Sequence, residues 1–232
     1  MIDPPNQGTG KSMEAIHSEL LDALPARAES PAEGLVARGW WSAPDVVPSD
    51  LATDLRHDLQ ALVEADRLRR GGIGRERDFQ VEASIRRDRI SWLTRDRPVQ
   101  RRFLDQMEAM RLDLNRALFL GLFEFECHYA VYPPGGFYRR HYDSFRGAAN
   151  RIVSLVAYLN PEWQPGDGGE LVLYADDSSR PLTRIEPRHG TLAIFLSEEI
   201  PHEVLPATKD RYSIAGWFRL NASIGGQVDP AR

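Results

Sequence analysis

Residues 138–143 read Tyr-Arg-Arg-His-Tyr-Asp, and the interpretation of the whole chain starts from this stretch. A histidine and an aspartate two residues apart on a strand project to the same side, because side chains alternate. With His202, His141 and Asp143 supply two imidazoles and one carboxylate, the facial triad typical of non-haem Fe(II) sites. We therefore predict a metal centre made of His141, Asp143 and His202.

A single arginine completes the predicted site. Arg211 begins an apolar run that extends from Tyr212 to Phe218. Its planar guanidinium suits the distal carboxylate of 2-oxoglutarate, whose other end would chelate the metal. Ser213 lies two residues further along the same predicted strand, so alternation places it on the same side, either as an additional hydroxyl for the ligand or as simple packing.

The composition indicates one globular domain with a sizeable core. The chain has 232 residues, of which 42% are hydrophobic and 27% are charged. No apolar run reaches the roughly 18 residues that a membrane-spanning helix needs. The one cysteine, Cys127, cannot form an internal disulfide, which fits a cytoplasmic location. The formal net charge of −5 argues against nucleic-acid binding.

Arginines crowd the middle of the chain, between Arg67 and Arg102, and acidic residues interleave with many of them. We expect a salt-bridged surface there. The alternative is a positive rim that attracts an acidic partner or a dicarboxylate.

Periodicity and turn residues divide the chain into an N-terminal extension (1–34), a domain (35–222) and a tail (223–232). Apolar stripes predict helices over 13–24, 51–65 and 99–118. The segment 66–84 is either a lid or an ordinary surface loop. Strands are predicted over 35–41, 85–92, 123–132, 137–142, 151–159, 171–174, 183–185, 191–196, 203–205 and 211–218. Helices followed by many short strands indicate a mainly β (α+β) fold, a sandwich or barrel with helices on one side.

Several ordered motifs carry a family resemblance. They are Tyr132-Pro133, Tyr138 to Asp143, Tyr158-Leu159-Asn160, Gly168 to Leu171, Pro201 to Val204, Arg211-Tyr212 and Trp217-Phe218, together with the pattern Ile85-Arg86-x-Asp88-x-Ile90-x-Trp92. These motifs closely resemble the 2-oxoglutarate- and Fe(II)-dependent prolyl 4-hydroxylases. Within them they are most similar to the oxygen-sensing prolyl hydroxylase domains (HIF prolyl hydroxylase-like) and their bacterial homologues.

The resemblance implies a double-stranded β-helix (jelly-roll, cupin-like) supported by N-terminal helices. It implies Fe(II) as cofactor, 2-oxoglutarate and O₂ as cosubstrates, and ascorbate as reductant. By the same match His141, Asp143 and His202 ligate iron, and Arg211 and Tyr158 hold the C5 carboxylate. The remaining matched site residues line the cosubstrate pocket, namely Tyr132, Tyr138 and Leu171.

The resemblance also implies a reaction and a partner. The leading hypothesis is hydroxylation of a proline in a protein loop or peptide, with the switch loop of elongation factor Tu as a candidate target, coupled to conversion of 2-oxoglutarate and O₂ to succinate and CO₂. The alternatives are a hydroxylase of a free amino acid or small metabolite, and a non-catalytic binding module on the same fold. Arg87 replaces a glycine of the oxygen sensors and Pro133-Pro134 lies in a shorter turn, so substrate choice stays open. We expect no nucleic-acid or membrane partner, and the sequence leaves the oligomeric state open.

Overall fold

The computed structural model describes residues 28–72, 84–144, 150–175 and 179–221. The chain divides into two compact units, Met1–Ser30 and Pro31–Arg232, and the described helices and strands belong to the second unit. The helix predicted over 13–24, and residues 73–83 of the segment that we treated as a lid or loop, lie outside the described residues. The domain limits drawn from the sequence stay predictions.

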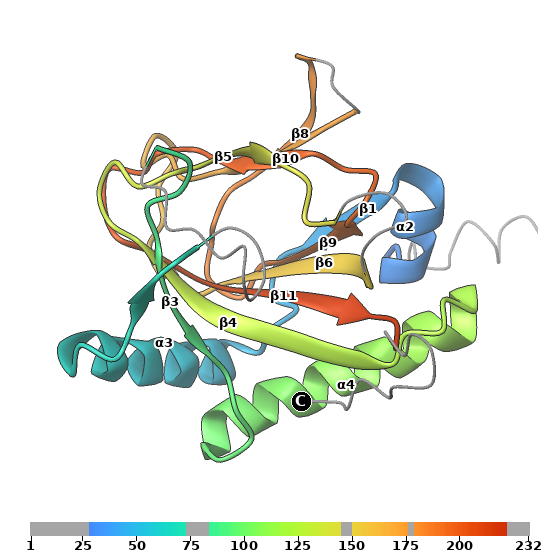
Figure 1. Cartoon of the computed structure of the whole chain (residues 1–232), viewed down its shortest axis with the longest axis horizontal. Helices are drawn as coiled ribbons and strands as arrows, with labels where there is room; N and C mark the ends of the chain where they lie inside the picture. Colours follow the sequence, from blue (N-terminus) through green and yellow to red (C-terminus); the bar gives the residue numbers. More distant parts are fainter. Residues whose placement is uncertain (1–27, 73–83, 145–149, 176–178, 222–232) are drawn as a thin grey trace, which may run out of the picture. The chain divides into compact units, whose positions relative to one another are not determined.

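Two antiparallel sheets form the framework of the second unit. The strands are β1 (Trp40–Ala43), β2 (Arg69–Arg70), β3 (Arg89–Trp92), β4 (Glu124–Tyr132), β5 (Tyr138–His141), β6 (Arg151–Tyr158), β7 (Leu171–Tyr174), β8 (Pro181–Ile185), β9 (Leu192–Leu196), β10 (His202–Val204) and β11 (Arg211–Arg219). The larger sheet has the order β1-β9-β6-β11-β4-β3-β2, and the smaller has the order β5-β10-β7-β8 (Figure 1). The predicted mainly β architecture is confirmed.

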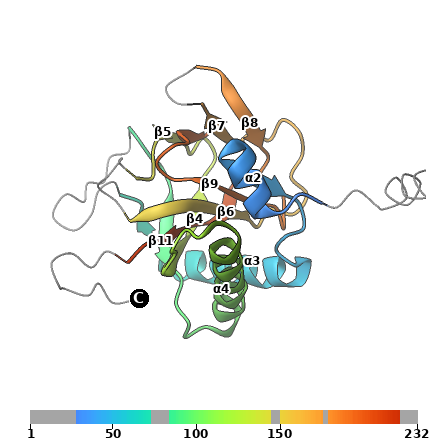
Figure 2. The ribbon, with the colours of Figure 1, turned by 90° about the vertical axis from the view of Figure 1, so that its right-hand side faces the viewer.

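The described residues form three helices, α2 (Pro31–Arg38), α3 (Ser49–Glu64) and α4 (Pro98–Leu118). The last two support the larger sheet on the side away from the smaller one. Figures 1 and 2 show α3 and α4 under the larger sheet, with β5, β7, β8 and β10 on its other side. Both helices match their predicted ranges to within two residues, because their apolar stripes are buried, as at Leu55 and Leu59 of α3 and Phe103 and Met107 of α4.

Alternation gives the larger sheet two different faces. On β4, Cys127, Tyr129 and Val131 pack with the helices in one core cluster. Ala130 and Tyr132 point the other way and pack in a second cluster with apolar residues of β7. The space between the two sheets therefore has its own lining, and the candidate site lies there.

The strand predicted over 35–41 is right only in its last two residues. Residues 35–38 belong to α2, and the strand β1 begins only at Trp40. Pro31 at the helix start and Gly39 at its end, with φ of 77°, are ordinary helix boundary residues. A Cβ added to Gly34 would lie 2.6 Å from Cβ of Trp41, so the helix packs closely against the strand that follows it. Short apolar runs do not by themselves distinguish a helix from a strand.

The strand predicted over 85–92 is right only in its second half. Residues 89–92 pair with β4, as expected of a strand of the larger sheet. The preceding residues instead pair with the region of β5, since Arg87 N donates to Phe137 O and Arg139 N donates to Ile85 O. This segment thus passes from one sheet to the other.

The interleaved arginines and acids form ion pairs, as the sequence predicted. Arg102 of α4 pairs with Asp50 and Asp54 of α3, and Arg95 pairs with Asp105, all with exposed side chains. Such pairs contribute little individually. Arg86 and Asp88 differ, because their ion pair is almost fully buried. None of the described helices is long and apolar enough to cross a membrane.

Candidate active site

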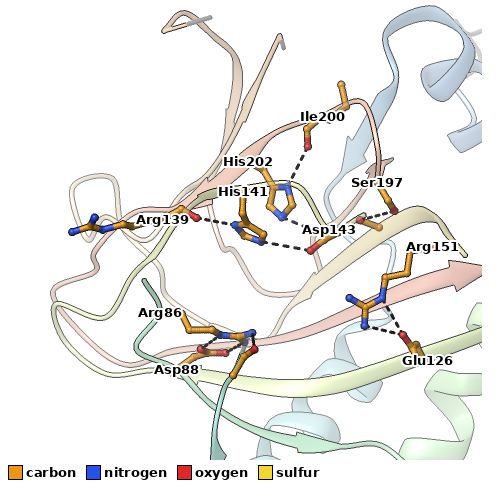
Figure 3. A network of polar contacts seen from close by, with 12 residues as sticks. Arg86, Asp88, Glu126, Arg139, His141, Asp143, Arg151, Ser197, Ile200 and His202 are labelled. Carbon is orange, nitrogen blue, oxygen red and sulfur yellow. Dashed lines mark hydrogen bonds and ion pairs between the residues drawn. The ribbon is translucent and has the colours of Figure 1, made fainter. Parts of the chain in front are cut away.

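The side chains of His141, Asp143 and His202 converge at one place, on the inner side of the smaller sheet (Figure 3). Nε2 of His141 lies 3.5 Å from Oδ1 of Asp143, and Nε2 of His202 lies 3.5 Å from Oδ2. One ligand atom from each residue lies within 4.8 Å of the other two. Two imidazoles and one carboxylate at this spacing fit a divalent transition metal with open coordination positions.

Backbone pairing places the two histidines but not the aspartate. His141 ends β5 and His202 begins β10, and these residues face each other in the antiparallel register of the two strands. Asp143 lies beyond the end of β5, in a bend. The predicted strand 137–142 therefore ends one residue early, and alternation along a strand does not explain how Asp143 reaches the cluster.

Hydrogen bonds fix which nitrogen of each imidazole faces the cluster. Nδ1 of His141 lies 2.8 Å from the carbonyl of Arg139, and Nδ1 of His202 lies 3.2 Å from the carbonyl of Ile200. A carbonyl oxygen only accepts, so each Nδ1 must carry the proton. The lone pair is then on Nε2, the atom that faces Asp143, which is the arrangement usual for metal-binding histidines.

Protonation states at neutral pH suit metal binding. Burial acts to raise the pKa of Asp143, but His202, His141 and a hydrogen bond from Ser154 outweigh it and hold that pKa well below its usual range. Burial lowers the pKa of His202 to about 4, against the opposing effect of Asp143. An ionised carboxylate and a neutral imidazole are the forms that bind metal.

Arg211 lies at the first position of β11 and is 1% exposed. Its Nε donates to Gly169 O at 2.7 Å, and its Nη1 donates to Ser213 Oγ at 3.1 Å. Nη2 is buried and has no hydrogen-bond partner in the described part of the chain. Among the described residues, no ion pair neutralises the Arg211 guanidinium. The buried positive charge is therefore available to bind an anion.

Tyr158 completes this second cluster. Its ring centroid lies 5.0 Å from Cζ of Arg211, and that of Tyr132 lies 5.2 Å away. Burial raises the pKa of Tyr158 to about 12, with Arg211 opposing, so the phenol keeps its proton. Its buried hydroxyl makes no hydrogen bond of good geometry with described residues. An unpaired guanidinium N–H beside an unpaired phenol fits a ligand carboxylate, because unpaired buried donors are costly.

The backbone around Arg211 is held tightly. Asn160 accepts a hydrogen bond from Tyr212 N at 2.7 Å and donates to Tyr212 O at 2.9 Å, which fixes the start of β11. Gly169 has φ of 72°, and a Cβ there would lie 3.1 Å from Cδ of Arg211. A side chain at this position would strain the backbone and would require Arg211 to shift by a few tenths of an ångström.

The three other predicted pocket residues fall into two groups. Tyr132 and Leu171 are buried with Tyr158 in the cluster between the sheets. Tyr138 packs against the same cluster and also reaches the metal cluster, where its ring stacks on His141 with centroids 3.6 Å apart and an interplanar angle of 19°. Cζ of Arg86 lies 4.6 Å from the centroid of the Tyr138 ring, so a buried cation backs this stack.

The sequence interpretation missed the residues that support the metal cluster. Ser154 Oγ lies 2.6 Å from Oδ2 of Asp143, and Ser197 Oγ lies 2.9 Å from Ser154 Oγ. Figure 3 also shows the bidentate pair of Arg86 and Asp88 near the site. One signal was present in the sequence: Ser154 is a polar residue in the apolar strand β6, four residues before Tyr158 and hence on the same face.

Comparison with known proteins decides the family. Residues 127–219 match the model of the 2OG-Fe(II) oxygenase superfamily. A crystal structure of a Pseudomonas putida prolyl-4-hydroxylase is 40% identical, with a TM-score of 0.75, over 82% of this chain and 97% of that chain. The chain belongs to the 2OG-Fe(II) oxygenase superfamily. The predicted resemblance and the double-stranded β-helix fold are thereby confirmed.

Two further relatives are also prolyl hydroxylases of this superfamily. A Trichoplax adhaerens prolyl hydroxylase, solved with a peptide fragment of the hypoxia inducible factor oxygen degradation domain, is 26% identical with a TM-score of 0.72, over 91% of this chain and 94% of that chain. The hypoxia-inducible factor prolyl hydroxylase of Caenorhabditis elegans is 36% identical over 92 residues, which are 38% of this chain and 12% of that protein. The match thus spans about an eighth of the length of this curated relative. The superfamily implies Fe(II), 2-oxoglutarate and O₂, and a triad of the right residue types is present.

Proposed function

We propose that this protein is a 2-oxoglutarate- and Fe(II)-dependent dioxygenase of the prolyl 4-hydroxylase type. One observation carries the proposal. A two-histidine, one-carboxylate cluster and a buried, unneutralised arginine both adjoin the space between the same two sheets. Ser154, which contacts Asp143, and Tyr158, which contacts Arg211, lie four residues apart on one face of β6, about 13 Å at about 3.3 Å per residue. A ligand that binds metal at one end and carries a carboxylate at the other fits this arrangement.

Each group has a role in the proposal. His141, Asp143 and His202 would hold Fe(II), which when bound supplies the activation of O₂ for oxidation of a C–H bond. Arg211 and Tyr158 would bind the C5 carboxylate of 2-oxoglutarate through N–H and O–H donors, with Ser213 fixing the guanidinium. Tyr132 and Leu171 exclude water around the carboxylate, and Tyr138 orients His141 through its stacked ring.

The substrate that we propose is a proline in a protein loop or peptide. The relatives that carry the name prolyl hydroxylase support this choice, and one of them was solved with a peptide bound. The switch loop of elongation factor Tu is our candidate target. Arg87, which is exposed beside Phe137, replaces a glycine of the oxygen sensors. The surface around Arg87 therefore differs from the corresponding surface of those enzymes.

The finer assignments form part of the same proposal. Ascorbate would keep the iron reduced between turnovers. A reducing, cytoplasmic location agrees with a single free cysteine, Cys127, which is buried and whose thiol pKa burial raises.

Substrate-dependent succinate formation tests the proposed function. The purified chain is supplied with Fe(II), 2-oxoglutarate and ascorbate, and succinate is measured with a proline-containing loop peptide, with the same peptide carrying alanine for proline, or with free proline. We expect stimulation by the proline peptide alone, and a mass increase of one oxygen on that proline. Stimulation by free proline would replace the proposal with a small-molecule hydroxylase. Absence of turnover together with absence of 2-oxoglutarate binding would leave a non-catalytic binding module.

A further inference from the structure

Asp143 is held differently from the two histidines of the cluster. The register of β5 and β10 sets His141 and His202 opposite each other. Asp143 follows the end of β5 and takes part in no strand pairing. Its side chain is nonetheless buried among charged and polar atoms, with 11% of its surface exposed. Something other than the smaller sheet must fix its position.

A serine of the larger sheet makes the contact. Ser154 lies in the middle of β6, where it pairs with Trp217 of β11 on one side and with Phe195 of β9 on the other. Its hydroxyl oxygen lies 2.6 Å from Oδ2 of Asp143, and the residue is 1% exposed. This hydrogen bond connects the two sheets at the metal cluster, because Ser154 belongs to one sheet and Asp143 follows a strand of the other.

A second serine supports the first. Ser197 follows β9 directly, is fully buried, and donates its backbone N–H to Ile152 O at 3.0 Å. Its hydroxyl lies 2.9 Å from that of Ser154. Figure 3 shows Ser197 on the side of Asp143 that faces away from the histidines.

The directions of these two hydrogen bonds follow from simple counting. An ionised carboxylate has no proton, so Ser154 must donate to Asp143. A hydroxyl has one proton, so Ser154 can only accept from Ser197, which donates. A hydroxyl that accepts one hydrogen bond becomes a stronger donor of the next. The chain Ser197 to Ser154 to Asp143 therefore has one orientation, and it ends on Oδ2.

We propose that Ser154 and Ser197 are positioning residues that hold the Asp143 carboxylate in its metal-binding orientation and thereby set the affinity of the cluster for a divalent metal. This inference rests on the proposed metal role of Asp143. With Oδ2 fixed by Ser154, rotation of the carboxylate is restricted, and Oδ1 stays beside Nε2 of His141. Partners that orient a metal ligand are typically worth about 10- to 100-fold in metal affinity.

Metal titration of serine variants tests the inference. The metal-free wild-type chain and the variants Ser154→Ala, Ser197→Ala and Ser154→Thr are titrated anaerobically with Fe(II), with Mn(II) as a redox-stable probe, and dissociation constants are determined. We expect Ser154→Ala to weaken binding about 10- to 100-fold. Ser197→Ala should weaken it less, because the direct hydrogen bond to Asp143 survives. Ser154→Thr keeps a hydroxyl at the same position and should restore most of the affinity.

Ser213→Ala is the matched control, since Ser213 is an equally buried serine on the same sheet face but contacts Arg211. It should leave the metal dissociation constant unchanged. Thermal unfolding of the metal-free variants separates a lost fold from a lost ligand. Wild-type affinity in a folded Ser154→Ala variant would overturn the role of the serines and leave the proposed function intact. Failure of the wild type itself to bind Fe(II) or Mn(II) would instead remove the proposed function.

Discussion

The two ends of the site are built by different means. At the anchor end, which comprises Arg211, Ser213 and Tyr158, each residue lies on a strand of the larger sheet, and the register pairs Ser213 directly with Tyr158. At the metal end, which comprises His141, Asp143 and His202, two residues come from paired strands of the smaller sheet and the third from a bend beyond it. Backbone pairing thus fixes the anchor end, while side-chain hydrogen bonds complete the metal end.

This difference separates what each end contributes. A site built on sheet register keeps its geometry without a ligand, because the strands are held along their length. A carboxylate held by one serine needs that contact and, when bound, the metal. We therefore expect variants at the anchor end to change 2-oxoglutarate binding alone, and variants at the metal end to change metal binding first.

Removal of Asp143 should have the largest effect. In Asp143→Ala the cluster keeps two imidazoles but loses its only anionic ligand, and we expect loss of Fe(II) binding and at least about 1,000-fold lower turnover, equivalent to about 4 kcal/mol. The metal-free fold should persist, because the substitution removes a buried charge rather than part of the core. Equilibrium dialysis for Fe(II), with circular dichroism for the fold, measures both.

The control for this variant is Asp113→Ala, which removes an exposed carboxylate on α4 that pairs with the exposed Arg116. It should bind Fe(II) like the wild type. If Asp143→Ala still bound iron at wild-type affinity, the triad would not be the metal site.

Arg211→Ala should have the next largest effect, and at the other end. Loss of two charge-assisted hydrogen bonds to the ligand carboxylate corresponds to roughly 3 kcal/mol, or about a 100-fold higher requirement for 2-oxoglutarate. Fe(II) affinity should be unchanged. Arg211→Lys, which keeps the charge but not the planar fork, should be intermediate. A parallel loss of metal affinity would show that the two ends are not separable.

The difference between register at the anchor end and side-chain hydrogen bonds at the metal end also explains which parts of the site the sequence predicted. Arg211, Ser213 and Tyr158 lie on strands that the apolar runs of the sequence predicted, so the alternation of side chains along a strand placed Ser213 beside Arg211 correctly. Asp143 was predicted on a strand and lies in a bend, because the chain must leave the smaller sheet to meet Ser154 of the larger one. No local pattern carries that contact between sheets.

The fold was predictable to a similar degree. Long periodic helices and strands, such as α4 and β11, were found within one or two residues. The predicted secondary structure was wrong where contacts with other elements, rather than the local sequence, decide the conformation of a segment. Residues 85–87 pair towards β5 while Arg89 to Trp92 pair with β4, and α2 turns at Gly39 to pack on its own following strand. Tertiary contacts determine the secondary structure of such segments, and those contacts cannot be inferred from the local sequence pattern.

The dependence of stability on pH tests a third region, which is the buried histidine of the larger sheet. His128 of β4 is 4% exposed, and its ring contacts those of Trp92 and Trp217. Burial lowers its pKa to about 4; Arg86 and Arg151 lower it as well, while Asp88 opposes them. The unfolded chain, with a histidine pKa near 6.5, therefore binds more protons than the folded chain between about pH 6.5 and pH 4. Stability should fall as the pH falls through this window.

The contribution of His128 should be about 2 kcal/mol between pH 7 and pH 5, from the difference between these two pKa values. Urea unfolding of the metal-free chain at several pH values measures it. His128→Gln should remove about that much of the pH dependence, leaving the part due to His202, whereas His57→Gln, at an exposed position of α3, controls for loss of an imidazole. Identical pH profiles for wild type and His128→Gln would mean that His128 is not the group that titrates.

Ser213→Ala should have the smallest effect, and it distinguishes the two ends most finely. Its hydroxyl accepts a hydrogen bond from Arg211 Nη1, but Gly169 O holds the same guanidinium independently, and the strand register holds the backbone. Loss of one hydrogen bond should cost about 1 kcal/mol, or about a fivefold higher 2-oxoglutarate requirement at unchanged Fe(II) affinity. The corresponding change at the metal end, Ser154→Ala, removes the only described hydroxyl contact of Asp143. If both serines proved equally important to their ligands, register would not be what protects the anchor end, and the difference between the ends would lie in the ligands rather than in the protein.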